Sequence, residues 1–168
     1  MLGELVMLHT ITSDNRDDHS EILEAMFKLR HDVVINQWKW DIPNIISGRE
    51  SDQFDKSDTV HFVLMGEEGT NLENTALVCA RLNPTTKPHM MDTLFPEYCN
   101  LQPSPAGQSV MEYSRYVSDN TLFQDMDAAK RGRLTINLAM IDFCLKNDVD
   151  RIVWLTHQLM YGLSLIHI

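Results

Sequence analysis

Residues 110–117 read Val110-Met111-Glu112-Tyr113-Ser114-Arg115-Tyr116-Val117. Their β-branched and aromatic residues predict a strand, and a strand this apolar is expected near the middle of a sheet, with helices on one or both faces. Two ionisable residues, Glu112 and Arg115, interrupt it. Charged groups inside a protein are costly unless they are paired, so these side chains belong either to a structural ion pair or to a functional site.

The spacing of Glu112 and Arg115 makes a further prediction about the strand. The two residues are three apart, and side chains of a regular strand alternate between its faces, so they should point to opposite sides. If both serve one pocket, a β-bulge or splay near Tyr113 and Ser114 must turn one of them round. The alternative is a Glu–Arg pair at a sheet edge.

Composition narrows the class of protein. A chain of 168 residues is enough for one domain with a core, and we treat residues 1–168 as one domain. No apolar run spans a bilayer, and the N-terminus lacks the features of a signal peptide. The formal net charge of −10 argues against nucleic acid as a general partner. Three cysteines and seven histidines show no disulfide or metal-ligand spacing, which favours reduced thiols in a cytoplasm and no metal.

Hydrophobic patterning predicts alternating strands and helices. We expect strands at residues 5–11, 59–66, 75–82, 110–117 and 151–156, and helices at residues 17–30, 127–146 and from 157 onward. This order is typical of an α/β sandwich of layers.

Two stretches lack regular periodicity. Residues 36–58 carry Trp38, Trp40 and five acidic side chains, and we expect a loop that folds over something, with a merely solvated acidic loop as the alternative. Residues 83–92 hold two prolines and are expected to form an irregular loop.

Several short motifs, taken in order, resemble the acyl-homoserine-lactone synthases, the LuxI-type autoinducer synthases. They are Leu29-Arg30-His31-x-Val33, Trp40, Glu50-x-Asp52-Gln53-Phe54-Asp55, Ala80-Arg81-Leu82-x-Pro84-Thr85-Thr86-x-Pro88, Phe95-Pro96 and Glu112-x-Ser114-Arg115. Each motif alone is weak, whereas their common order and spacing from about residue 26 to residue 150 is specific. The resemblance implies an α/β/α sandwich like that of the GCN5-related N-acetyltransferases (GNAT).

The resemblance also implies a reaction. S-adenosylmethionine (SAM) donates its α-amine to the acyl thioester of an acyl-carrier protein, which gives an amide. The SAM carboxylate then displaces the sulfonium, closing a homoserine lactone and releasing methylthioadenosine. SAM is a substrate, so no cofactor is expected. The implied partners are SAM and acyl-acyl-carrier protein, the product is a quorum-sensing signal, and we expect a monomer.

The family's site residues carry over to matching positions. The implied catalytic set is Glu112, Arg115 and Ser114, with Glu112 accepting the proton of the amine directly or through water. The implied substrate-binding set is Arg30, Trp40, Asp52, Asp55 and Arg81. These types suit SAM, because aromatic faces and carboxylates attract a sulfonium and a guanidinium binds a carboxylate. In the alternative, Arg81 only pairs with Asp52 or Asp55 and holds the acidic loop.

Two positions depart from the family pattern. The usual Phe four residues after Arg30 is Val34 here, which removes one wall of the SAM site unless Trp38 replaces it. The usual Leu between Glu112 and Ser114 is Tyr113, a milder change.

An acidic carrier protein needs a basic docking face, even though this chain is acidic overall. The candidates are Lys130, Arg131, Arg133, Lys146 and Arg151. A cluster of this kind is more often a solvated helix face.

Other functions remain open. One is a different GNAT-fold acyltransferase that uses acyl-CoA and another amine; the pyrophosphate loop of that wider class is absent, since residues 130–133 match it poorly, which counts against acyl-CoA. Another is a degenerate, non-catalytic binding protein. Members of the family continue further, and residues 162–168 match nothing expected, so we expect that C-terminal elements are missing.

Overall fold

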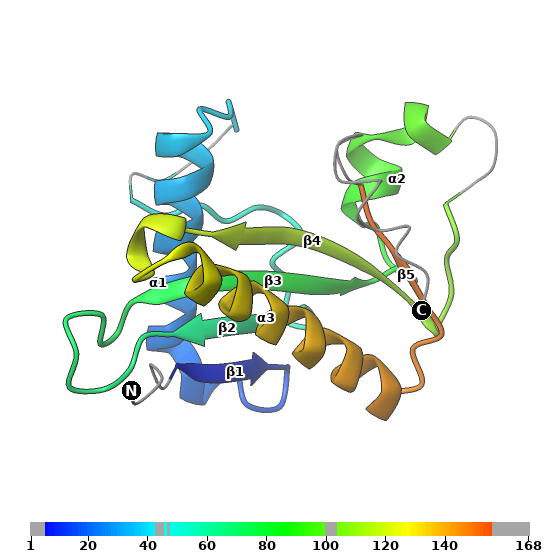
Figure 1. Ribbon diagram of the computed structural model, residues 1–168. Helices are drawn as coiled ribbons and strands as arrows, with labels where there is room; N and C mark the ends of the chain where they lie inside the picture. The colour runs from blue at the N-terminus through cyan, green and yellow to red at the C-terminus, as the bar shows by residue number, and fades with distance from the viewer. Residues whose placement is uncertain (1–5, 43–45, 47, 100–103, 156–168) are drawn as a thin grey trace.

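The structure is a computed structural model that describes residues 6–42, 46, 48–99 and 104–155. In this part, five strands form one sheet in the order β1-β2-β3-β4-β5 (Figure 1). They are β1 (Met7–Ile11), β2 (Val60–Met65), β3 (Ala76–Pro84), β4 (Val110–Ser118) and β5 (Arg151–Val153). The first four strands are antiparallel, and β5 runs parallel to β4.

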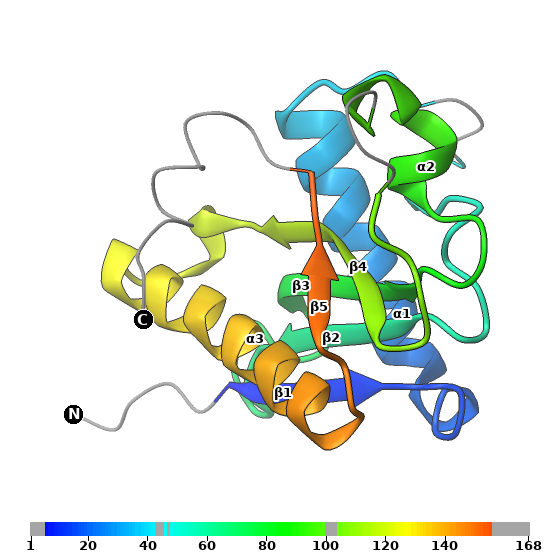
Figure 2. The ribbon, with the colours of Figure 1, turned by 90° about the vertical axis from the view of Figure 1, so that its right-hand side faces the viewer.

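Helices cover both faces of the sheet. Helix α1 (Ser20–Arg30) follows the 3₁₀ turn η1 (Asp17–His19), continues as the π-helix η2 (His31–Gln37), and packs on one face. Helix α3 (Met126–Lys146), preceded by the 3₁₀ turn η4 (Asn120–Leu122), packs on the other face (Figures 1 and 2). The short α2 (Met90–Leu94) and the 3₁₀ helix η3 (Pro96–Cys99) lie between β3 and β4 in the chain.

The predicted strands and the first two predicted helices are confirmed, with boundaries that shift by a few residues. The prediction for residues 83–92 is wrong in part. Strand β3 runs on to Pro84, opposite Met111, because a proline at the last position of a strand costs little pairing. Helix α2 then begins at Met90, where His89 and Asp92 form a capping box that satisfies N–H groups at the helix start.

The expected irregular segment also begins later than predicted. The helical path of α1 continues to Gln37 in the π-helix η2, whose Val33 and Val34 are fully buried in the core under α1. Burial of these valines outweighs the weak local helix signal. The described residues between Trp38 and Thr59 are mostly irregular, with short turns, as expected for a loop.

Strand residues alternate between two separate cores. On the α1 face, Val63, Cys79 and Val117 pack against Phe27 and its neighbours. On the α3 face, Phe62, Leu82 and Tyr113 pack against Ile136 and its neighbours. Cys79 and Cys144 are free and buried, and burial raises the pKa of Cys79 to about 12.

A β-bulge in β4 breaks this alternation. Cys79 pairs with Val117 while Arg81 pairs with Ser114, so Arg115 and Tyr116 together oppose Ala80. Arg115 adopts a left-handed conformation with φ +51°. The bulge places Arg115 on the same face as Ser114, the α1 face. The predicted irregularity is therefore confirmed, one residue further along the strand.

Strands β4 and β5 pair over three positions only, where residues 110–112 meet residues 151–153. Beyond Glu112, β4 continues to Ser118 without a strand beside that edge in the described part of the chain. The predicted helix from residue 157 and the C-terminal prediction fall on residues outside the described ranges. No helix among the described residues is long and apolar enough to cross a membrane.

Candidate active site

Three arginines and three carboxylates form one buried ion-pair network on the α1 face of the sheet. The arginines are Arg30, Arg81 and Arg115, and the carboxylates are Glu50, Asp52 and Asp55. Their formal charges cancel. The network joins the end of α1, the loop before β2, and strands β3 and β4, four regions that are far apart in sequence.

Arg30 is the last residue of α1 and is fully buried. Its Nη1 and Nη2 donate to the two carboxylate oxygens of Asp55 at 2.8 and 3.0 Å, and its Nε donates to Glu50. A bidentate pair of this kind fixes both partners in one orientation. Arg30 therefore ties helix α1 to the acidic loop, with each of its three guanidinium nitrogens bonded to a carboxylate.

Arg81 joins the loop to the sheet. Its Nη1 and Nη2 donate to Asp52 at 2.7 and 3.0 Å, its Nη1 also reaches Asp55 at 2.9 Å, and its Nε donates to Ser114 Oγ at 2.8 Å. The suggested role of Arg81 in holding the acidic loop is confirmed. The hydroxyl of Ser114 accepts this bond and so helps to orient the guanidinium of Arg81.

The electrostatics of the network favour the charged forms of Asp52, Asp55 and Arg30. Burial by itself would raise the pKa of Asp55, yet the charges and hydrogen bonds of Arg30 and Arg81 outweigh it and lower that pKa. The pKa of Asp52 is also lowered, because Arg81 and Arg115 outweigh the effect of burial. Burial would lower the pKa of Arg30, but Asp55 and Glu50 raise it.

Arg115 is the member of the network that faces outward. Its Nη2 lies 3.0 Å from Glu50 Oε1 and 2.7 Å from Asp52 Oδ2, and its Nε donates to Glu50 at 3.1 Å. Its Nη1 contacts the sulfur of Met90 at 3.8 Å, and the side chain keeps 11% exposure. A thioether is a weak acceptor. Arg115 thus presents one guanidinium edge that a stronger acceptor could take.

Glu112 is fully buried and is bound by backbone amides. Its carboxylate accepts hydrogen bonds from the N–H groups of Met90 at 3.0 Å and Met91 at 2.6 Å, at the start of α2. Within the described residues no arginine pairs with it, so the alternative of a Glu112–Arg115 pair is not what the structure shows. Each oxygen retains a further lone pair for a substrate proton or a water.

Sequence reasoning missed three residues beside this site. Glu50 bridges Arg30 and Arg115, and its place in the motif with Asp52 and Asp55 was the available signal. Asn83 pairs with Glu112 across the sheet, and its buried Nδ2 has no partner among the described atoms. The same is true of Nε2 of buried His89, which directly precedes the two amide donors. A side-chain pattern cannot reveal these last two.

The aromatic residues assigned to SAM lie at the surface. Trp40 is 53% exposed, its ring centroid is 5.3 Å from that of Trp38, and the structure gives neither ring a contact with the ion-pair network. Val34 is buried in the α1-face core. The structure therefore brings Arg30, Asp52, Asp55, Arg81, Ser114 and Arg115 together, with Glu112 beside them, but not Trp40.

The five basic residues predicted to dock a carrier protein fall into two groups. Lys130, Arg131 and Arg133 lie in the first turns of α3, where Lys130 pairs with Asp127 and Arg133 with Asn120. Lys146 lies sixteen residues after Lys130, about 24 Å along the helix, and pairs with Asp142. Arg151 is exposed at the start of β5. Gly132 serves packing, since a Cβ there would lie 2.9 Å from the Phe123 ring.

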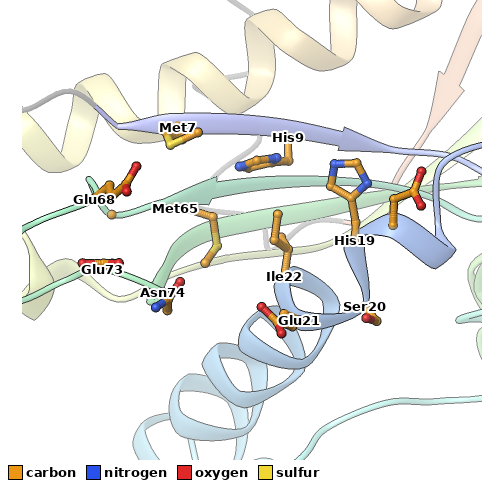
Figure 3. A pocket seen from close by; sticks show the side chains of 12 residues that line it. Met7, His9, His19, Ser20, Glu21, Ile22, Met65, Glu68, Glu73 and Asn74 are labelled. Atoms are coloured by element: carbon orange, nitrogen blue, oxygen red, sulfur yellow. The ribbon is translucent and has the colours of Figure 1, made fainter.

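A hollow of about 590 Å³ lies elsewhere, between β1, the start of α1 and the β2–β3 connection (Figure 3). His9 and His19 meet there edge to face at 5.6 Å, beside Glu21, Glu68 and Glu73. Burial and the charge of His19 lower the pKa of His9. None of the predicted site residues lines this hollow.

In the described part of the chain, no group of three or more metal-ligand side chains is arranged to hold a metal.

The arrangement of the sheet and its helices identifies the fold class. A sheet with helices on both faces, whose β4 and β5 pair briefly and then separate, is the GNAT-like α/β fold. A suspected N-acetyltransferase from Lactobacillus plantarum shares this fold at a TM-score of 0.54 and 14% identity, over 95% of this chain and 82% of that one. The α/β sandwich prediction is therefore confirmed at the level of the fold.

The chain belongs to the autoinducer synthase family, whose profile matches residues 13–164. It is 33% identical over 148 residues to the isovaleryl-homoserine lactone synthase of Bradyrhizobium diazoefficiens, covering 87% of this chain but 62% of that protein. The structure of BjaI, a CoA-dependent acyl-homoserine lactone synthase with SAM and isopentyl-CoA, matches at a TM-score of 0.78 and 28% identity, over 94% of this chain and 70% of BjaI.

Proposed function

We propose that this protein is an acyl-homoserine-lactone synthase. The amine of SAM takes the acyl group from a thioester, which frees the thiol of the donor, and the SAM carboxylate then displaces the sulfonium to release a lactone and methylthioadenosine. The observation that carries the proposal is the bulge in β4. It turns Arg115 onto the face that already holds Ser114 and Glu112, next to the point where β4 and β5 separate. A guanidinium and a carboxylate then stand beside one substrate site.

Arg115 suits the SAM carboxylate. Of the three network arginines it is the one with an outward edge, and its Nη1 rests on nothing stronger than the Met90 sulfur. A carboxylate that replaces this sulfur gains a charge-assisted hydrogen bond. Arg30 and Arg81, whose guanidinium nitrogens all bond to carboxylates or to Ser114, keep Arg115 and the loop in place and do not contact the substrate.

Glu112 suits the role of base. The amides of Met90 and Met91 fix its carboxylate, so its free lone pairs point in defined directions. Because it is buried, the proton of the amine reaches it most readily through a water, and the unpartnered atoms of Asn83 and His89 lie beside that route. A positioned base typically contributes about 10²–10⁴-fold to the rate.

The edge of β4 beyond Glu112 suits the thioester. Its backbone N–H groups on the β5 side have no strand partner in the described part of the chain. Backbone N–H groups at such an edge are the donors that stabilise a tetrahedral oxyanion. The carbonyl of the acyl donor would lie between this edge and the amine of SAM.

For the acyl donor, we put acyl-CoA first, because BjaI is CoA-dependent and matches over most of this chain. The poor match of residues 130–133 to a pyrophosphate loop weighs less than this likeness. An acyl-carrier protein is the second candidate, and the exposed Lys130 and Arg131 favour it. Both donors would give the same lactone, and they are distinguished by which one supports turnover and by the thiol that is released, free CoA or the carrier protein.

The test is to incubate the protein with SAM and a panel of acyl donors that includes isovaleryl-CoA and acyl-carrier proteins. We expect an N-acyl-homoserine lactone and methylthioadenosine in equal amounts, measured by mass spectrometry. Amide formed from acyl-CoA and an unrelated amine, with none from SAM, would instead support another GNAT-fold acyltransferase. Binding of SAM without turnover by any donor would support a non-catalytic protein.

A further inference from the structure

Asn83 lies directly opposite the proposed base. It pairs with Glu112 across strands β3 and β4, two positions along from the pair of Arg81 with Ser114. Residues that pair in this way point to the same face of a sheet, with Cβ atoms about 4.5–5.5 Å apart. That face is the α1 face, which holds the ion-pair network. Asn83 is 5% exposed and Glu112 is fully buried, so a buried amide stands beside the buried carboxylate.

The hydroxyl of Thr59 decides how the amide of Asn83 is oriented. Its Oγ1 lies 2.7 Å from Oδ1 of Asn83 and 2.8 Å from the carbonyl oxygen of Phe54, and it accepts the N–H of Lys56 at 2.9 Å. A hydroxyl has one hydrogen, which cannot serve two acceptors equally. The carbonyl can only accept, whereas the amide can turn by 180° and donate through Nδ2. This orientation gives each of these groups a partner and leaves Oδ1 of Asn83 as the atom without one among the described residues.

The free end of the amide lies on the side of Glu112. Thr59 directly precedes β2, and β3 lies between β2 and β4, so the atom turned away from Thr59 is on the β4 side. Glu112 keeps lone pairs beyond its bonds to the amides of Met90 and Met91. A group that bridges two acceptors must bring two hydrogens, as water does. A water that donates both hydrogens here has only lone pairs left, and it can therefore accept a proton.

We propose that Asn83 is a positioning residue that holds, together with Glu112, the water through which the amine of SAM loses its proton. This role rests on the proposed function, because it serves the same amine. In the step, an N–H bond of the ammonium breaks and its electron pair stays on nitrogen for attack on the thioester. The water takes that proton and passes one of its own to Glu112, so the water is regenerated and both charges are neutralised. If Asn83 only fixed the loop through Thr59, its loss would affect stability and not proton transfer.

Asn83→Leu removes the amide and keeps a similar volume. We expect kcat for lactone formation to fall about 10- to 100-fold at neutral pH, a part of what a positioned base contributes. The dissociation constant for SAM, measured by calorimetry, should change less than about threefold, because Arg115 and the network remain. The proton must then leave to bulk solvent, so raising the pH to about 9 should recover about tenfold, as for an amine with a pKa of about 7.7–8.0.

Asn83→Asp keeps the shape of the side chain and serves as a second variant if the leucine variant does not fold. It places a carboxylate opposite Glu112, and two neighbouring carboxylates disfavour each other's ionisation, so the pKa of the pair rises. The pH at which kcat reaches half its maximum should move up by at least about one unit. The other ionisable side chains around this position, His89, Arg81 and Arg115, are the same in the parent and the variant. An unchanged midpoint in folded Asn83→Asp would overturn the placement of Asn83 beside the base.

A double variant and a matched control separate positioning from a structural role. Asn83→Leu added to Glu112→Gln should cost little further activity, because groups that act as a unit are not additive. Asn137→Leu makes the same change on the α3 face, where Asn137 accepts from the Tyr113 hydroxyl, and should keep the parent pH profile. Additive losses, or near-normal kcat in a folded Asn83→Leu, would overturn the role of Asn83 and leave the proposed function intact. A parent that makes no lactone from any donor would overturn both.

Discussion

The two faces of the sheet differ in their interactions, although residues of the same strands alternate between them: the α1 face holds the buried ion-pair network, and the α3 face holds an apolar core. On the α1 face, Arg81 of β3 takes part in a network of fully formed ion pairs, each with defined donor and acceptor atoms. On the α3 face, its neighbour Leu82 lies in an apolar core. The ion-pair network depends on direction, because a charge-assisted hydrogen bond has a required geometry. The apolar cores, of which each face has one, depend on area, because hydrophobic burial has no direction.

This difference explains where the two faces tolerate change. A carboxylate or a guanidinium on the α1 face that loses its partner remains buried and charged, which is costly. An apolar side chain on the α3 face that becomes smaller leaves a cavity whose cost depends on how well its surroundings relax. Substitutions on the two faces should therefore differ in size and in their response to pH.

The largest effect on stability is expected for Arg81→Ala. It leaves Asp52 and Asp55 without their shared partner and should reduce the free energy of unfolding by about 3–5 kcal/mol, measured by urea denaturation. The matched control is Lys146→Ala, which removes an exposed pair with Asp142 and should cost less than about 1 kcal/mol. Equal losses in the two variants would contradict the importance of burial.

Glu112→Gln tests the chemistry on the same face. We expect kcat to fall about 10²–10⁴-fold, because the base is lost. Raising the pH to about 9 should recover only about tenfold, the part due to removing a proton from an amine with a pKa of about 7.7–8.0. Glu24→Gln, an exposed control, should keep full activity. Near-normal turnover of a folded Glu112→Gln would leave Glu112 only its role of anchoring α2.

Gly132→Ala tests close packing on the α3 face. The added Cβ would lie 2.9 Å from the Phe123 ring and 3.1 Å from Leu64, so α3 or its neighbours must move. Overpacking of this kind typically costs about 1–3 kcal/mol. Thermal melting should show a lower midpoint with SAM binding retained, since the site lies on the other face. An unchanged midpoint would show that Phe123 gives way easily.

His61→Phe tests the pH response of the α1 face. His61 is buried beside Phe27 without a hydrogen-bond partner for either ring nitrogen in the described structure, and burial lowers its pKa to about 3. The unfolded chain binds a proton there below about pH 6.5, and the folded chain does not. Stability should thus fall by about 1.4 kcal/mol per pH unit below about 6.5.

In His61→Phe the part of this slope due to His61 should disappear between about pH 6 and pH 4, which leaves the part due to His9, whose pKa is also lowered, as measured by urea denaturation at each pH. The loss that remains at lower pH comes from Asp52 and Asp55, whose pKa values are lowered and whose pairing is present above the unfolded value of about 3.9. Identical acid limbs in the parent and the variant would remove His61 as the cause.

The sequence by itself determined the order of the elements and the family. Strand patterns are short-range and repeat every two residues, so residues 110–117 could be assigned without any knowledge of their neighbours. The motifs also identified six of the seven charged residues in and beside the network. Glu50 was the exception, because a motif does not say which of its acids bridges two arginines.

Only the tertiary structure decided how these residues meet. The bulge that turns Arg115 arises from a mismatch of one residue between β3 and β4, and such a register belongs to a pair of strands, not to either sequence. The partners of Glu112 are backbone amides, which every residue carries and no pattern marks. Helix α3 carries apolar residues on both sides, so its sequence does not say which side is buried. The structure buries the side with Ala129 and Gly132 and leaves Leu134 and Leu138 exposed.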